Sequence, residues 1–243
     1  MPQLEGIPQV YGIHPHEDSS DQKHPLGTIG YAADGRKYRY AQAAGTALTA
    51  GNLGVAPDIS TNHEDLAVNT FSVGDFRITV TLGGTAITGN EYDEGFVSVI
   101  DETGQGIMYK IANIPTSSAG SEDIIITLAE PIRVAAAAAT TVTLYRNKYR
   151  DVVESDTNQT DLVVGVPNVE IAIDFYGWLQ VGGPCSILVD SNDTTAGQPI
   201  TNGNAVAGAV ETRNAATEQY LGMQPVGNNS DAGEYGIYEL AID

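Results

Sequence analysis

The chain has 243 residues, including 27 glycines and 11 prolines, and its 31 Asp and Glu residues outnumber 11 Lys and Arg residues, for a formal net charge of −20. A chain of this length buries roughly 70–75% of its unfolded surface, so a core needs no disulfide or metal, and the single cysteine excludes an internal disulfide. The acidity argues against nucleic-acid binding, which needs concentrated Lys and Arg, and no stretch is long and apolar enough to cross a bilayer.

Residues 1–25 are polar and interrupted by prolines, which predicts an extended N-terminal arm rather than a helix. The apolar residues of this arm are Leu4, Ile7, Val10, Tyr11 and Ile13. They are too sparse to form a core alone, so we expect them to lie along a partner, with a frayed terminus as the alternative.

The arm also contains three of the four histidines, His14, His16 and His24. A His-x-His pair in a strand places both rings on one face, which suits a divalent metal. No cysteine joins them and no catalytic spacing such as HExxH is present. The preferred interpretation is therefore a mobile acidic segment whose histidines titrate near neutrality, and we expect neither a metal nor a cofactor.

Regular patterning begins at Leu26, with a strand over residues 28–32, a hairpin turn at Asp34-Gly35 and a returning strand over residues 36–42. Lys37 and Arg39 share one face of the returning strand. In residues 145–150, Arg146, Lys148 and Arg150 are predicted to share a face opposite two tyrosines. Scarce positive charge beside tyrosines suggests contact with an acidic partner, but pairing with carboxylates of the same chain is the favoured interpretation. The candidate contact residues are Ile7, Tyr11, Ile13, Lys37, Arg39, Arg146, Lys148 and Arg150.

A second β unit begins near Asp65, after a glycine- and alanine-rich connection. Its expected strands span residues 69–73, 77–82, 95–101, 106–111, 124–128 and 141–145, with a hairpin at Gly83-Gly84. The alanine run at residues 135–139 is too short for a stable helix. The polar segment 151–161 is the expected linker, so the predicted units are 26–155 and 156–243.

In the C-terminal part, Trp178 begins an alternating strand that Pro184 ends, and a second strand follows over residues 185–189. A polar turn at residues 190–195 and a small-residue strand at 205–210 come next. Cys185 is expected to be a buried apolar residue rather than a nucleophile. The whole pattern predicts an all-β protein in which short antiparallel strands form β-sandwich or barrel units.

The strand phrases GTIGYAADGRKYRYAQAAGTALTAGNL, NEYDEGFVSVIDETGQGIMYKI and YGWLQVGGPCSILVD, with AGQPI, YLGMQPV and the closing YGIYELAI, carry a family resemblance. They resemble structural proteins of tailed-bacteriophage particles, in particular capsid decoration (cement) proteins. The resemblance implies a virion protein that is made in the bacterial host cytoplasm and binds the outer surface of the head. Its partners would be the major capsid protein and further copies of itself, in a dimer or trimer.

The chain lacks a GxSxG elbow, a Walker loop and a dinucleotide fingerprint, so we predict that it is not an enzyme. The oxygens of Asp190, Asn192 and Asp193 lack the glycine and glutamate of an EF-hand loop and indicate a polar turn. One alternative function is a head-fibre or tail protein that contacts host surface glycans. Another is an envelope-degrading enzyme, which would need two carboxylates or a metal in one cleft.

Overall fold

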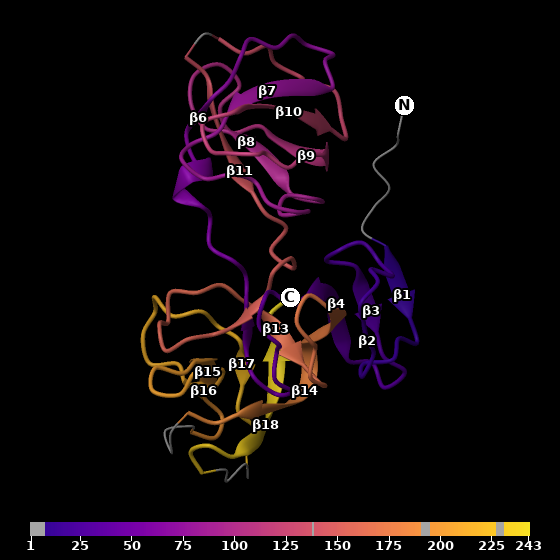
Figure 1. Cartoon of the computed structure of the whole chain (residues 1–243). Coiled ribbons are helices and arrows are strands. Elements are labelled where there is room, and N and C mark those ends of the chain that lie inside the picture. Colours follow the sequence, from indigo (N-terminus) through magenta and orange to yellow (C-terminus); the bar gives the residue numbers. More distant parts are fainter. Residues whose placement is uncertain (1–7, 138, 191–194, 227–230) are drawn as a thin grey trace. The chain divides into compact units, whose positions relative to one another are not determined.

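The computed structural model describes residues 8–137, 139–190, 195–226 and 231–243. The protein is all-β, as predicted, and its described residues form two compact units (Figure 1). One unit comprises Asp58–Asn147, and the other combines residues 8–57 with Lys148–Asp243. These bounds differ from the predicted 26–155 and 156–243, because strands before Pro57 pair with strands after Lys148. We call the inserted part the 58–147 unit and the other the discontinuous unit.

The 58–147 unit is one six-stranded antiparallel sheet in the order β6-β11-β8-β9-β10-β7, preceded by a short 3-10 helix at Thr61–His63. Its strands are β6 (Leu66–Ala67), β7 (Arg77–Thr81), β8 (Phe96–Val99), β9 (Met108–Asn113), β10 (Asp123–Leu128) and β11 (Thr141–Tyr145). Side chains alternate between core and solvent, so that Ile124 and Ile126 are buried while Ile125 between them is exposed.

Five of the predicted central strands are confirmed, at β7 to β11, but the strand expected at residues 69–73 is not formed. The hairpin predicted at Gly83-Gly84 is also wrong, because β7 pairs with β10 rather than with the strand that follows it. The described residues of the alanine run form no helix, as expected.

The discontinuous unit is a twelve-stranded sheet in the order β1-β3-β4-β14-β18-β17-β15-β16, with β2, β5, β12 and β13 attached beside this path. Its strands are β1 (Gln9–Tyr11), β2 (Asp18–Ser19), β3 (Ile29–Tyr31), β4 (Lys37–Gln42), β5 (Gly54–Val55), β12 (Val153–Glu154), β13 (Val163–Pro167), β14 (Tyr176–Leu188), β15 (Pro199–Asn202), β16 (Val210–Thr212), β17 (Gly222–Met223) and β18 (Tyr235–Ala241). The predicted linker therefore contributes β12 to this sheet, where it pairs with β5.

β14 is the central strand of this unit. It runs through Pro184 without a break, which corrects the prediction of two strands. β4 pairs with β14 only up to Gly182, and β18 pairs with it from Gly182 onward, so Pro184 has a paired strand on one side. The small-residue strand expected at 205–210 is absent from the described structure, since β16 begins at Val210.

The described part of the predicted arm, residues 8–25, lies along its own unit. β1 pairs in parallel with β3, and β2 pairs with β14. The chain approaches the core closely at Gly30, where a Cβ atom would lie 2.6 Å from Trp178 Cζ3 and 2.9 Å from Ile13 Cδ1. The arm thus stays extended, as predicted, but its ordered contacts are with the same chain.

Candidate functional site

The C-terminal strand β18 divides its side chains between a core and an open surface. Tyr238 and Leu240 point into a buried cluster that also contains Cys185 and Ile187 of β14. On the other side of the strand, Ile237 is 59% exposed. One face of this part of the sheet is therefore packed and the opposite face is open.

Strand register determines which residues share the open face, because directly opposed side chains in an antiparallel pair point the same way. β14 aligns Ser186 with Ile237 and Pro184 with Glu239. β17 aligns Met223 with Glu239. The resulting surface, which we call the Ile237 face, consists of Pro184, Ser186, Met223, Tyr235, Ile237 and Glu239, all exposed. Its labelled strands β14, β18 and β17 are shown in Figure 1.

The Ile237 face is mainly apolar and has one carboxylate, Glu239, among its six residues. Sequence reasoning did not single it out, because β18 carries large apolar residues on both sides, Tyr235 and Ile237 on one and Tyr238 and Leu240 on the other. Alternation alone could identify a strand here but not its outward side. The register with β14 supplies that information.

Among the arm residues predicted to contact a partner, Tyr11 is 73% exposed. Its ring stacks on Tyr31, with centroids 5.3 Å apart and planes inclined by 13°. Ile13 instead packs against the buried cluster around Trp178. Ile7 lies outside the described residues. Of the two described candidates in the arm, Tyr11 is thus the one with surface left for a partner.

Lys37 and Arg39 both lie on β4, as predicted, and both face the C-terminal residue. Arg39 forms an ion pair with Asp243 and donates a hydrogen bond to the Gly27 carbonyl at 2.8 Å, while its own exposure is 9%. Lys37 Nζ lies 3.8 Å from Asp243 Oδ1. Arg39 is therefore built into the unit, which matches the favoured interpretation of pairing inside the chain.

The residues Arg146, Lys148 and Arg150 do not share a strand face, which corrects the prediction, because β11 ends at Tyr145. Arg146 pairs with Glu91 in the 58–147 unit. Lys148 and Arg150 belong to the discontinuous unit. Lys148 Nζ lies 5.0 Å from the centroid of the Tyr149 ring. Arg150 is 4% exposed and donates to Gln42 Oε1 at 3.0 Å, which fixes the start of the C-terminal segment.

A buried histidine in the 58–147 unit was not singled out from the sequence. His63 is 1% exposed, and its Nδ1 lies 2.6 Å from the Tyr92 hydroxyl while its Nε2 lies 3.1 Å from the Thr85 carbonyl oxygen. A carbonyl only accepts, so Nε2 of the neutral ring donates to Thr85 and Nδ1 accepts from Tyr92. Burial raises the pKa of Tyr92 to about 12, and Glu91 adds to this increase. Both ring nitrogens are engaged, so this group is structural.

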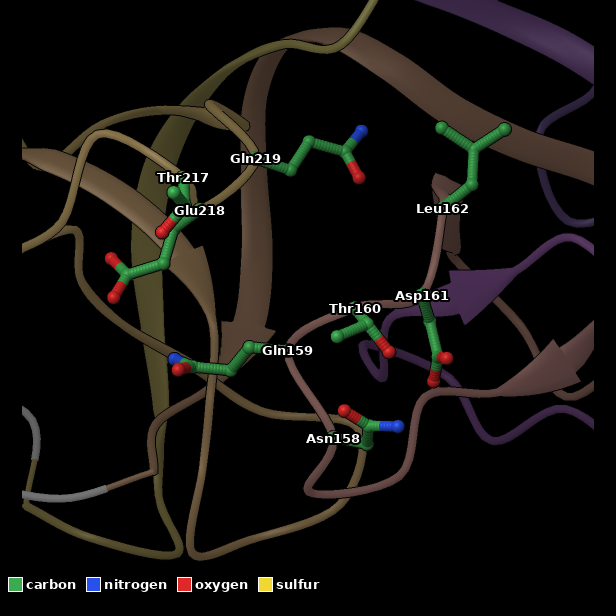
Figure 2. Close-up of a pocket in the computed structure, with 8 residues that line it drawn as sticks. All are labelled: Asn158, Gln159, Thr160, Asp161, Leu162, Thr217, Glu218 and Gln219. Atoms are coloured by element: carbon green, nitrogen blue, oxygen red, sulfur yellow. The ribbon is translucent and has the colours of Figure 1, made fainter.

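A groove with a volume of about 740 Å³ lies in the discontinuous unit (Figure 2). It is lined by Asn158, Gln159, Thr160, Asp161, Leu162, Thr217, Glu218 and Gln219. Gln219 accepts from the Val163 N–H at 2.9 Å and donates to the Val163 carbonyl at 3.0 Å. Gln159 donates to Glu211 Oε1 and to the Asn202 carbonyl. The hydrogen bonds of Gln159 and Gln219 thus connect segments of the same unit. The described lining contains no aromatic ring on which a sugar could stack.

No group of three or more His, Cys, Asp and Glu side chains that could hold a metal occurs in the described part of the chain. The histidines His14 and His16 contact each other edge to face, with ring centroids 5.9 Å apart. The oxygen cluster considered at Asp190 extends to Asn192 and Asp193, which lie outside the described residues. Cys185 is buried, as predicted, and burial raises the pKa of its thiol to about 12.

Among the described residues, no helix has the length and apolar character needed to span a membrane. Comparison with models of protein families, with curated proteins and with solved structures found no match.

Proposed function

We propose that this protein is a tailed-bacteriophage capsid decoration protein, which binds the outer surface of the head and stabilises it. The observation that carries the proposal is the Ile237 face, an open sheet surface bearing Ile237, Met223 and Tyr235. Removing apolar surface from water contributes about 25 cal/mol per Å². Exposed apolar patches on soluble proteins mark interaction sites, so this face is suited to lie against another protein.

Charge favours the outside of the particle over the inside. The formal net charge of −20 repels the phosphates of packaged nucleic acid. The family resemblance of the strand phrases supports the same location. The proposed partner is the major capsid protein, contacted by several copies of this chain assembled as a dimer or trimer. Weak contacts made by several linked copies add up to stable attachment through high effective concentration.

The test compares two isoleucines of similar exposure. Ile237 is 59% exposed on β18, and Ile125 is 53% exposed on β10 of the other sheet. We expect Ile237→Asp to weaken binding to capsids that lack the protein by roughly tenfold or more, because a contact worth about 1.5–3 kcal/mol is replaced by a buried charge. Ile125→Asp is the matched control and should bind like the wild type.

Binding is measured by sedimentation of capsids with increasing protein concentration, after circular dichroism has verified that both variants are folded. Equal binding of the two variants would refute the assignment of the Ile237 face to the capsid. Weaker binding of Ile125→Asp alone would instead move the contact to the 58–147 unit.

A further inference from the structure

Two acidic side chains are buried together in the discontinuous unit, where β14 ends and β16 begins. Asp190 is 2% exposed and Glu211 is 4% exposed. The backbone N–H of Asp190 donates to the carbonyl of Val210 at 3.0 Å, which brings the two residues side by side. Asn204 binds both carboxyl groups, with its backbone N–H on Asp190 Oδ2 and its side-chain amide on Glu211 Oε1.

In each carboxyl group, one oxygen accepts hydrogen bonds from two N–H groups. Asp190 Oδ2 accepts from the backbone N–H groups of Asn204, at 2.7 Å, and Ala205, at 3.0 Å. Glu211 Oε1 accepts from Gln159 Nε2, at 2.6 Å, and Asn204 Nδ2, at 3.1 Å. Asp190 Oδ1 is buried and receives no N–H or O–H donor from the described residues. A protonated carboxyl group on the neighbouring Glu211 would supply the donor that this oxygen lacks.

Two ionised carboxylates in contact within a low-dielectric interior repel each other, and the pair is stabilised when one of them is protonated. Burial raises the pKa of Glu211, and the neighbouring charges of Asp190 and Glu218 raise it further. The charged groups that raise the pKa of Glu211 are thus both negative, which makes Glu211 the candidate to hold the proton.

We infer that Asp190 and Glu211 share one proton, which the Glu211 carboxyl donates to Asp190 Oδ1, and that losing it destabilises the junction of β16 with the turn at residues 203–205. The sign of the effect follows from linkage. A group whose pKa is higher in the folded than in the unfolded chain stabilises the fold fully below its unfolded value, here 4.5. That stability is lost as the pH rises through the folded value.

The first experiment follows unfolding of this unit by the fluorescence of Trp178, the only tryptophan, in urea at a series of pH values. Glu211→Gln keeps the shape of the side chain and offers an N–H to Asp190 Oδ1 at every pH. We expect the folding constant of the wild type to fall relative to that of Glu211→Gln as the pH rises, by up to about tenfold per pH unit in the titration range.

Glu154→Gln is the matched control, since Glu154 accepts from the Thr49 N–H at 2.6 Å and from Asn52 Nδ2 at 3.2 Å. It should keep the pH dependence of the wild type. An identical pH dependence in Glu211→Gln and the wild type would overturn the inference. So would a urea midpoint that calcium raises at alkaline pH in the wild type but not in Glu211→Gln, because a cation would then occupy the place of the proton.

A second measurement needs no variant. The carboxyl carbon of Glu211 is followed by NMR through a pH titration of the native protein. A midpoint above the ordinary value of 4.5 is the expected result. A midpoint at or below that value would overturn the inference, even if Glu211→Gln failed to fold.

Discussion

Replacing Arg39 with alanine is expected to destabilise the discontinuous unit, although Arg39 was first considered as a partner-contact residue. Its guanidinium donates to the Gly27 carbonyl at 2.8 Å, pairs with Asp243 and lies 5.9 Å from the centroid of the Tyr149 ring. A hydrogen bond from a charged group contributes about 1.5–3 kcal/mol. The ion pair adds about 0.5–1 kcal/mol, because the Asp243 side chain is 28% exposed and partly screened by solvent. The expected loss is about 2–4 kcal/mol.

Urea unfolding followed by Trp178 fluorescence measures this loss, since Trp178 belongs to the same unit and is 1% exposed. A slope of about 2 kcal/mol per M, in the middle of the usual range, predicts a midpoint lowered by roughly 1–2 M. Lys23→Ala is the control. Lys23 pairs with Glu17, and the side chains are 46% and 33% exposed, so its removal should change stability by less than about 0.5 kcal/mol. Equal midpoints for the two variants would refute the structural role of Arg39.

Two further substitutions or reactions report on the core of the same unit. Gly30→Ala places a Cβ atom 2.6 Å from Trp178 Cζ3. We expect this overpacking to lower the free energy of unfolding in urea by about 1–3 kcal/mol and to alter Trp178 emission. An unchanged urea midpoint would contradict the packing described. Cys185 is 4% exposed and its thiol has a pKa raised to about 12, so a thiol reagent near neutral pH should label it slowly before unfolding and completely afterwards. Rapid labelling of the native protein would show that this strand is accessible.

Strands with strict alternation could be predicted from the sequence. In β7 and β10, buried isoleucine and valine alternate with exposed residues, and the predicted ranges match the structure closely. The order of these strands could not be predicted, because β7 pairs with β10 across two intervening strands. Local patterns contain no information about such partners.

The division into units failed for the same reason. β4 pairs with β14 although about 140 residues separate Tyr38 from Gln180 in the chain. The polar segment 151–161 has the composition of a linker, yet Val153 pairs with Val55 in the sheet. The glycine- and alanine-rich connection before Asp65 indicated where the nested unit Asp58–Asn147 begins, but no change in composition marks its end at Asn147.

Residue types alone identified the candidate contact surfaces only in part. Basic residues beside tyrosines indicated a contact surface, but the carboxylates that neutralise them, Asp243 for Arg39 and Glu91 for Arg146, come from distant parts of the chain. The pairing of Asp190 with Glu211 was hidden for a similar reason. Each directly follows an apolar run, and the parallel bridge between Val189 and Val210 brings these two distant parts of the chain together.

The most direct test of the proposed function is the number of copies that capsids lacking the protein bind at saturation. Purified wild-type protein is added to such capsids, and the bound amount is measured after sedimentation. The proposal predicts saturation at a copy number that matches the symmetry of the capsid, with no further binding to capsids that already carry the protein. No binding, or only a few copies per particle, would contradict a role in decoration.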